Sequence, residues 1–376
     1  MSEVDNDEVW DLVEEAMDMP DGPAKVGVME QAVRLADALN DVETSYQVRL
    51  NLLEACTFGG YPEKALVAFA WCQTQFDKDP ERFEEHDLLW RQKWIIDKLA
   101  NFPQFSKQQI YEMLDDMARR YEAWGAGKRS ELKLRYSIAY AMGDKSETRR
   151  LMGEWEKTYR DDLTDCEACE VDDLVEMNTF FGDYEGAVKA GDVVLKTPLR
   201  CMHVPHTTHA RLLKPLFFLG RYQEAMQNHR KGYPMIRDNP AFLCGASQTL
   251  EFLVLTDNLG KATKVLEAHL SWATDTKELW MRFRFYLSAL LLLNTLLDRG
   301  KETISLTLNQ TCPYAEPGGK IDLKVMRDRM MKEAEAIGAS FDKRNENTYF
   351  KDWMKEHDSY RNRIIHVPLK STVEAR

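Results

Sequence analysis

The chain has 376 residues and a net charge of −12, and 44% of its residues are hydrophobic. The excess of acidic residues argues against general nucleic-acid binding, which needs cations that displace counterions from phosphates. The best candidate for a membrane span, residues 285–297, has thirteen residues and falls short of the eighteen or so that a span requires. We therefore expect neither nucleic acid nor a membrane among its partners.

The N-terminal segment indicates the compartment. Residues 1–19 contain eight acidic residues and no Lys or Arg, whereas signal and transit peptides are basic. We therefore expect a cytoplasmic protein. The chain has seven cysteines, an odd count, and a reducing compartment makes a disulfide framework unexpected.

The sequence predicts paired helices along most of its length. Gly and Pro fall mostly between helical patterns, and no alternating run is long enough for a strand. The acidic first helix is expected to cap the array, and Ser106 is expected to cap the second helix of the third pair. The expected pairs are 6–18 with 24–39, 42–58 with 62–77, 81–100 with 106–123, 130–142 with 145–158, 167–181 with 184–196, 205–219 with 222–236, 242–257 with 260–271, and 276–298 with 301–309.

The pattern changes after residue 310. A loop leads to a charged helix at 321–337 and then to a tail that is locally basic from Lys351 onward. This tail can fold back or dock a partner, and fraying is the simplest expectation. The predicted organisation is a helical array over 1–310, followed by a loop, a capping helix and a tail over 311–376.

A short phrase of a turn glycine, an aromatic residue and a helix-opening alanine recurs along the chain. Its clearest copies are GGYPEKA at 59–65, GDYEGA at 182–187 and GRYQEA at 220–225, and weaker copies are MGDKSET at 142–148, DNLGKA at 257–262 and RGKET at 299–303. Aligned on the small residue, the intervals are 83, 39, 38, 37 and 41 residues, so one unmarked unit is expected near 107–110. A period of this size is typical of stacked helical hairpins.

The phrase has a physical meaning. The glycine is expected to close the first helix in a left-handed conformation, while the aromatic packs across the turn and the alanine lets two helices approach. Tetratricopeptide repeats fill the same positions with Gly, Tyr and Ala, and the chain resembles that superfamily over about residues 20–310. It departs from the family in mostly lacking the first-helix Trp and the closing Pro, and its period exceeds the usual 34 or so.

The resemblance implies an all-α fold, a right-handed α-solenoid of about eight stacked antiparallel helix pairs. It also implies a concave groove for a protein or peptide ligand, and no catalytic chemistry. Stretches at 82–106, 160–170 and 341–350 are similar to uncharacterised bacterial tetratricopeptide proteins, a likeness that brings no activity with it.

One constellation in the sequence carries chemistry. Cys166 and Cys169 open one predicted first helix, and Cys201 and His206 lie at the start of the next, with 35 residues, close to one period, from Cys166 to Cys201. Equivalent positions of adjacent repeats lie side by side, so both clusters should meet at one edge of the array. Three thiolates and one imidazole are the ligand set of structural zinc, with His203 as a substitute for His206. Simple packing of cysteines in helices and a redox dithiol are the alternatives.

The first helices also suggest a groove. Because first helices line the concave face in this superfamily, we expect a basic floor made by His209, Arg211, Lys214, Arg282 and Arg284. Such a floor suits an acidic or C-terminal carboxylate ligand. The alternative is a set of ordinary solvated charges.

The expected function is that of a non-catalytic adaptor. No Gly-x-Ser-x-Gly elbow, Walker loop, dinucleotide fingerprint or His-Glu-x-x-His is present, so the sequence names no catalytic residue. The alternative is a peptide-responsive regulator of a bacterial signalling or transcription pathway, since some such regulators carry tetratricopeptide-like domains. Those proteins usually place a basic helix-turn-helix or a helical effector bundle before the repeats, whereas this chain begins with an acidic segment.

Overall fold

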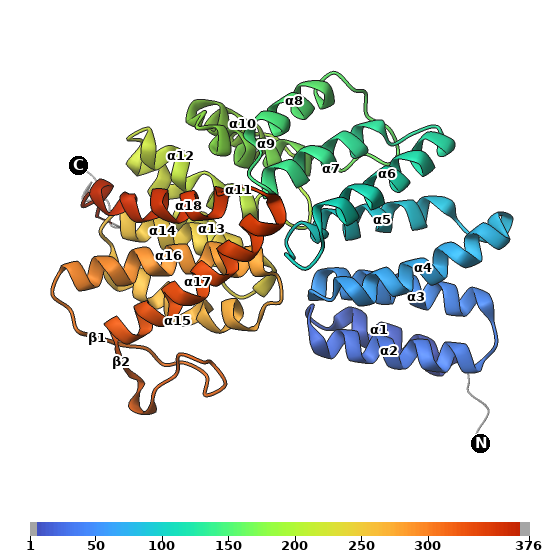
Figure 1. Cartoon of the computed structure of the whole chain (residues 1–376), viewed down its shortest axis with the longest axis horizontal. Helices are drawn as coiled ribbons and strands as arrows, with labels where there is room; N and C mark the ends of the chain where they lie inside the picture. The colour runs from blue at the N-terminus through green and yellow to red at the C-terminus, as the bar shows by residue number, and fades with distance from the viewer. Residues whose placement is uncertain (1–5, 369–376) are drawn as a thin grey trace. The chain divides into compact units, whose positions relative to one another are not determined.

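The computed structural model describes residues 6–368 and forms two compact units, the first ending at Thr164 and the second beginning at Asp165 (Figure 1). Within the described residues the secondary structure is helical except for one short two-stranded sheet. The prediction of an all-α protein made of packed helix pairs is therefore confirmed. None of the described helices is long and apolar enough to cross a lipid bilayer. Residues 1–5 and 369–376, the end of the predicted tail, lie outside the described residues.

The first unit consists of consecutive helix pairs that agree with the predicted ones. They are α1 (Asn6–Asp18) with α2 (Pro23–Ala38), α3 (Val42–Gly59) with α4 (Pro62–Lys78), α5 (Glu85–Leu99), preceded by the 3-10 turn η1 (Pro80–Arg82), with α6 (Lys107–Trp124), and α7 (Lys128–Ala141) with α8 (Lys145–Trp155). The first helices of successive pairs also pack on each other, α3 on α5 and α5 on α7. Ser106 caps α6 in a reciprocal capping box with Gln109, as predicted.

The second unit continues the pattern and adds C-terminal elements. Its helices are α9 (Glu167–Phe181) with α10 (Tyr184–Lys196), α11 (His206–Arg211) and α12 (Leu213–Phe218) with α13 (Tyr222–Ile236), α14 (Leu243–Leu255), preceded by η2 (Pro240–Phe242), with α15 (Leu259–Asp275), and α16 (Leu279–Asp298). Here α9 packs on α11, α11 and α12 pack on α14, and α14 packs on α16. The first helices of this unit thus also touch in succession.

The recurring phrase closes helices as its composition predicts. Gly60 and Gly182 follow α3 and α9 in the left-handed region, with φ of 81° and 79°. A residue with a side chain adopts this backbone conformation only at a cost in free energy, which explains why glycine recurs there. The alanines of the phrase at Ala65 and Ala187 are fully buried, so the paired helices meet where the side chain is smallest.

The last predicted pair is wrong in its second member. Residues predicted as a helix at 301–309 instead contain β1 (Thr303–Ser305), which pairs antiparallel with β2 (Lys320–Asp322) across a loop that includes η3 (Pro317–Gly319). Ile304 lies opposite Ile321, and both are buried while their strand neighbours are exposed. A single buried position in each strand gives a pattern too short to separate strand from helix by periodicity.

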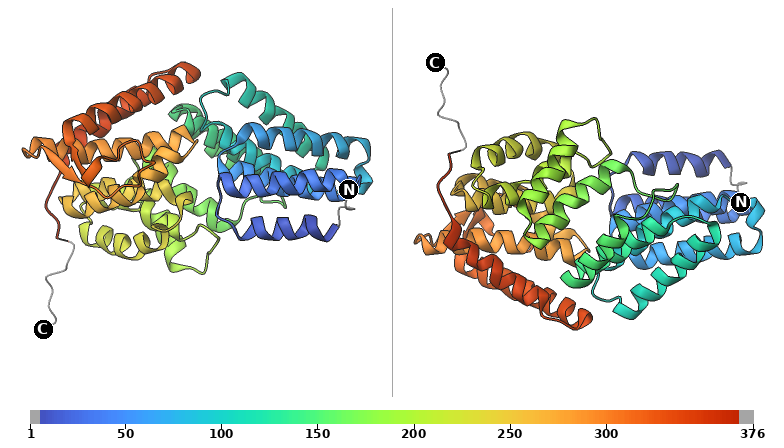
Figure 2. Two further views of the ribbon diagram at one scale, coloured as in Figure 1. Left: turned by 90° about the horizontal axis from the view of Figure 1, so that it is seen from below. Right: turned by 90° about the horizontal axis from the view of Figure 1, so that it is seen from above.

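The C-terminal region is helical beyond the predicted capping helix. It comprises α17 (Leu323–Asn345), α18 (Tyr349–Ser359) and η4 (Tyr360–Arg363). Figure 2 shows α17 and α18 along one side of the second unit, where both pack on α16. The expectation that the tail frays from Lys351 is therefore wrong for its described part. Residues 351–363 are helical, and Ile365 and Val367 bond the backbone at the end of α14. The boundary predicted at residue 310 falls inside the second unit.

Candidate functional site

Three cysteine thiols converge at the start of α9. Cys166 is the N-cap residue of α9, Cys169 lies in its first turn, and Cys201 lies in the loop before α11. Their three sulfur atoms all lie within 4.8 Å of one another. The prediction that one repeat period brings these residues together is thus confirmed for the three sulfurs.

The surrounding backbone holds this arrangement. The Cys166 sulfur accepts a hydrogen bond from the Cys169 amide at 3.4 Å, which caps the helix as an Asp or Ser side chain would. Cys201 and Val204 bond each other through their backbones, at 3.1 and 3.3 Å, which closes the loop that carries the third thiol. Val204 in turn packs with Ala168 and Val194 in a small apolar cluster beneath the sulfurs.

The thiols differ in acidity. Burial raises the pKa of Cys169, and its hydrogen bonds with the Cys166 and Cys201 sulfurs raise it further. Burial also acts to raise the pKa of Cys201, but hydrogen bonds from the other two thiols and from the Met202 and His203 amides outweigh it and lower that pKa. Of these two thiols, Cys201 is therefore the one that more readily becomes a thiolate. A soft cation would replace the protons that the three sulfurs share.

The fourth predicted ligand is not among these donors. His206, the first residue of α11, stacks on Phe242 with ring centroids 5.6 Å apart, and its buried Nδ1 has no hydrogen-bond partner among residues 6–368. His203 packs edge-on against the same ring at 5.5 Å. Repeat spacing places a residue along the chain, but it does not show that an aromatic ring from η2 will hold an imidazole.

The five residues predicted as a basic groove floor are engaged within the second unit. Arg211 of α11 donates hydrogen bonds to Asp172 at 2.8 Å and to Asp173 at 3.0 Å, both on α9. Arg284 of α16 forms an ion pair of 3.0 Å with Glu176, also on α9. The acids of α9 thus bind the cations of the neighbouring first helices, a pairing that the sequence analysis did not identify.

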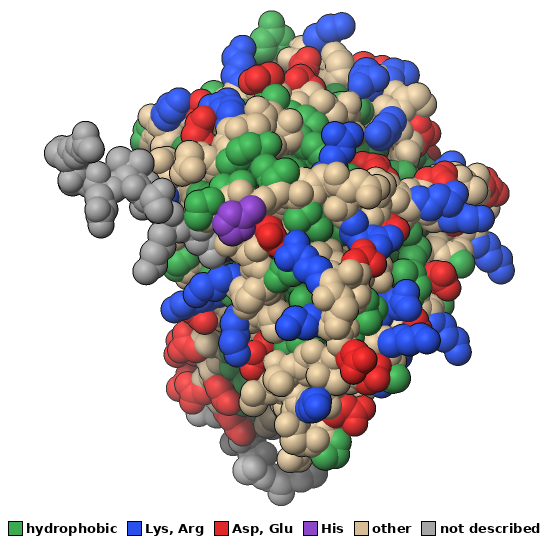
Figure 3. Space-filling view, turned by 90° about the vertical axis from the view of Figure 1, so that its left-hand side faces the viewer, with side chains coloured by type: hydrophobic (Ala, Val, Ile, Leu, Met, Phe, Trp, Pro, Cys, Tyr) green, Lys and Arg blue, Asp and Glu red, His purple; other side chains and the backbone are tan. Residues whose placement is uncertain are grey.

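The other three are held by neutral or mixed partners. Arg282 donates to the backbone carbonyls of Ala273, Thr274 and Thr276, near the end of α15. His209 is buried and bonds the Asn228 side chain at 2.8 Å. Lys214 donates a hydrogen bond to the Tyr360 hydroxyl at 2.8 Å. On the face drawn in Figure 3, basic and acidic side chains are likewise interspersed.

The C-terminal segment, residues 349–367, covers the first helices of the second unit. We call the covered surface the first-helix face; it consists of Phe180 of α9, Lys214 and Phe218 of α12, Glu251 of α14, and Trp280 and Phe283 of α16. Its contacts with the segment are Phe180 with Tyr349, Trp280 and Phe283 with Trp353, Glu251 with His357, and Lys214 and Phe218 with Tyr360. This packing of residues far apart in sequence could not be read from the repeat.

A buried polar group lies at the centre of the first-helix face. The Glu251 carboxylate accepts a hydrogen bond from His357 Nε2 at 2.6 Å and lies 3.9 Å from Lys214 Nζ. Burial acts to raise the pKa of Glu251, but the charges of Lys214 and His357 outweigh it and lower that pKa to about 2. Glu251 is therefore an anion at neutral pH, and the C-terminal segment supplies part of its compensation.

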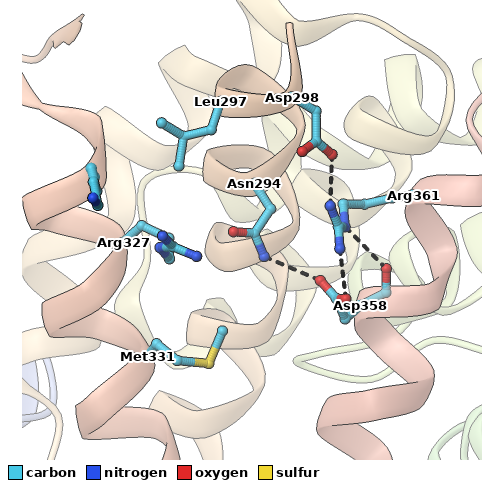
Figure 4. Close-up of a pocket in the computed structure, with 8 residues that line it drawn as sticks. Asn294, Leu297, Asp298, Arg327, Met331, Asp358 and Arg361 are labelled. Atoms are coloured by element: carbon cyan, nitrogen blue, oxygen red, sulfur yellow. Dashed lines mark hydrogen bonds and ion pairs between the residues drawn. The ribbon is translucent and has the colours of Figure 1, made fainter. Parts of the chain in front are cut away.

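An open pocket of about 400 Å³ lies where the C-terminal segment meets α16 and α17 (Figure 4). Arg361 bridges Asp298 at 2.6 Å and Asp358 at 2.8 Å, and Asn294 donates to Asp358 at 3.1 Å. In Figure 4 the Arg327 side chain projects from α17 toward this network. Most charges that line the pocket thus fasten the C-terminal segment to α16.

Two features of the second unit therefore bear on function. The thiol cluster offers three soft donor atoms, and the first-helix face offers aromatic and charged partners for a helix. No protein-family model matches the chain, and no curated protein sequence is significantly similar to it.

Proposed function

We propose that the protein is a non-catalytic scaffold that binds a helical segment of a partner protein on the first helices of a tetratricopeptide-like array. The observation that carries this proposal is α18, an aromatic-bearing helix that lies on the first helices of the second unit. A surface that accepts one such helix within the chain has the chemistry to accept another from a partner.

The first unit offers a comparable row for the partner. There, Trp94 of α5 packs edge-on against Phe58 of α3, with centroids 5.4 Å apart, and against Trp90 at 6.3 Å. All three rings are half-buried, so each presents part of its surface. Aromatic side chains on neighbouring helices are common anchors of binding energy at protein interfaces. We assign the partner's helix to this row because the equivalent face of the second unit is covered.

Exchange of one aromatic anchor tests this assignment. Partners captured with the tagged full-length chain in its native host are purified and titrated by calorimetry against wild type and Trp94→Ala. We expect Trp94→Ala to weaken binding about 30-fold, the loss typical of a central aromatic anchor. Val67→Ala is the matched control, because Val67 is 73% exposed on the second helix α4. Equal affinity of Trp94→Ala and wild type for every captured partner contradicts the assignment.

The thiol cluster supports a second proposal, that of a structural zinc ion. We infer that Cys166, Cys169 and Cys201 bind zinc and thereby join the start of α9 to the loop before α11. Structural zinc is almost always four-coordinate. The fourth ligand that we propose is His206, whose buried Nδ1 lacks a partner among the described residues. Its ring has to leave Phe242 in order to bind the ion.

Metal analysis tests the zinc proposal. Protein purified without chelator is expected to contain about one zinc per chain, and Cys169→Ser is expected to lose the metal and to lower the melting temperature of the protein. Cys244→Ala is the control, since Cys244 lies on α14 and outside the cluster. Metal-free wild-type protein, together with an unchanged melting temperature for Cys169→Ser, rules the ion out.

A further inference from the structure

The C-terminal segment has the pattern of a helical ligand. Tyr349, Trp353, His357 and Tyr360 are spaced by four, four and three residues, so they lie on one side of α18 and its continuation. Each of them contacts the first-helix face, and together they reach four different helices. The opposite side of α18 carries Lys351, Asp352 and Lys355, all of which are exposed.

The contacts combine aromatic packing with directional polar bonds. Trp353 packs on Phe283, with centroids 5.6 Å apart. His357 bonds the buried Glu251, and Lys214 donates to the Tyr360 hydroxyl at 2.8 Å. Aromatic anchors give affinity, and the buried polar pairs give register, because a helix that leaves Glu251 or Lys214 unpaired pays their desolvation.

After η4 the segment has no regular secondary structure and bonds the C-terminal end of α14. The Ile365 amide donates to the Leu255 carbonyl at 2.9 Å, and the Val367 amide donates to the Thr256 carbonyl at 3.1 Å. The Asn258 side chain donates to the Val367 carbonyl at 2.9 Å. These three bonds use only backbone groups of the segment, so another chain that follows the same path can make them whatever its side chains.

One residue tethers the segment to α17. Phe350 is fully buried and stacks on Phe341 of α17, with centroids 4.5 Å apart and an angle of 8° between the rings. Its amide donates to the Asp342 carboxylate at 2.8 Å, next to a turn in which Glu346 has a φ of 58°. Release of residues 353–367 can therefore leave this anchor in place.

We propose that residues 353–367 are a self-bound ligand of the first-helix face, in competition with a partner helix that carries an aromatic residue, a His four residues later and a Tyr three residues after that. This inference rests on the proposed helix-binding function and adds to it a second helix-binding site, on the second unit, which the chain's own segment occupies. The tether gives the internal segment an effective concentration on the order of millimolar, so a partner in trans binds weakly until the segment is loosened.

Substitutions within the segment test the proposal, because they leave the first-helix face unchanged. The full-length triple variant Trp353→Ala, His357→Ala, Tyr360→Ala is titrated with a fluorescent peptide of residues 347–368. We expect the peptide to bind the triple variant at least 30-fold more tightly than it binds wild type. The matched control is the triple variant Lys351→Ala, Asp352→Ala, Lys355→Ala, on the exposed side of α18, which is expected to bind the peptide as weakly as wild type does. A peptide with the same three core alanines should not bind either chain.

Hydrogen exchange of residues 353–367 decides how a negative result is read. If the segment exchanges freely in the triple variant and the peptide still fails to bind, the face does not recognise a helix in trans and the proposal is wrong. If the segment stays protected, its side chains do not hold it, which also overturns the proposal. If the triple variant folds poorly, the milder double variant His357→Gln, Tyr360→Phe, which keeps side-chain volume, takes its place. We expect it to bind the peptide about tenfold more tightly than wild type does. These results do not depend on Trp94, so failure here is distinct from failure of the proposed partner site.

Discussion

Replacement of Arg211 by methionine is expected to lower the free energy of unfolding of the second unit by about 3–5 kcal/mol. The Arg211 side chain is 21% exposed, and its guanidinium faces Asp172, Asp173 and Glu176 of α9. Asp172 is only 3% exposed, and burial raises its pKa against the opposing charge of Arg211. Without the arginine, a buried carboxylate keeps hydroxyl bonds from Thr207 and Thr208 but loses its cation. An uncompensated buried charge is among the most destabilising single changes.

Urea unfolding followed by circular dichroism measures this loss. The double variant Arg211→Met, Asp172→Asn is expected to recover part of the stability, because the neutral amide leaves no buried charge while it can still accept from a threonine. Arg150→Met is the control, since Arg150 pairs with Glu147 and Glu154 on the exposed side of α8, and its unfolding midpoint is expected to be unchanged. A wild-type midpoint for Arg211→Met means that the acids of α9 are stabilised by other groups.

Much of the fold could be predicted because its signals are local. Turn glycines such as Gly60 and Gly182, and a cap such as Ser106, act within one turn of the helix that they end or begin. Burial of small residues at Ala65 and Ala187 follows from the same phrase. These features depend on residues that are close in sequence. The helix pairs therefore agree with the predicted ones up to α16.

Contacts between residues far apart in sequence could be predicted only where the repeat period indicated which positions lie side by side. One period separates Cys166 from Cys201, and the sulfurs do meet. A similar interval, 39 residues, separates Asp172 from Arg211, so the repeat period could also have predicted this ion pair. Phe242 lies 36 residues after His206, also close to one period, so the spacing places this ring near the imidazole without showing that the two rings stack. The spacing could not place the C-terminal segment over Glu251, because His357 lies beyond the last copy of the phrase.

The C-terminal segment also shows why composition misleads at a chain end. A locally basic tail is usually expected to fray, yet residues 349–367 bring aromatic side chains at helical spacing and a histidine for a buried acid. The acid is the deciding partner. The buried carboxylate of Glu251 needs partners, and it has Lys214 of α12 at 3.9 Å and His357 of the C-terminal segment at 2.6 Å.

Acidification from pH 7 to pH 5 is expected to destabilise the second unit through histidines whose pKa values are lowered by burial, among them His269 and His229. His269 of α15 is fully buried, and burial lowers its pKa to about 4, although Asp238 acts in the opposite sense. Its Nε2 accepts a hydrogen bond from the Tyr233 hydroxyl at 3.1 Å, and its Nδ1 has no hydrogen-bond partner in the described part of the chain. Burial, together with the charges of Arg230 and Lys261, likewise lowers the pKa of His229 to about 4. The folded protein therefore favours the neutral form of both rings.

The direction of the pH effect follows from these two values. Each folded pKa lies below the unfolded value of about 6.5, so the contribution to stability is complete above pH 6.5 and is lost as the pH falls toward 4. The loss is on the order of 1–3 kcal/mol for each ring by pH 4. Glu251 adds a similar loss only below its ordinary pKa of about 4.5, because its folded pKa is about 2. The window from pH 6.5 to 5 therefore reports on the histidines.

Melting temperatures measured between pH 7.5 and 5 test this expectation. His269→Gln keeps an acceptor for the Tyr233 hydroxyl but cannot gain a proton, so its melting temperature should fall less across this range than that of wild type. His366→Gln is the matched control, because it removes a histidine at an exposed position. Equal slopes for wild type and His269→Gln would show that the buried ring is not the group that titrates. A reduced slope that persists in 0.5 M salt would separate burial, which salt does not screen, from surface charge repulsion, which it does.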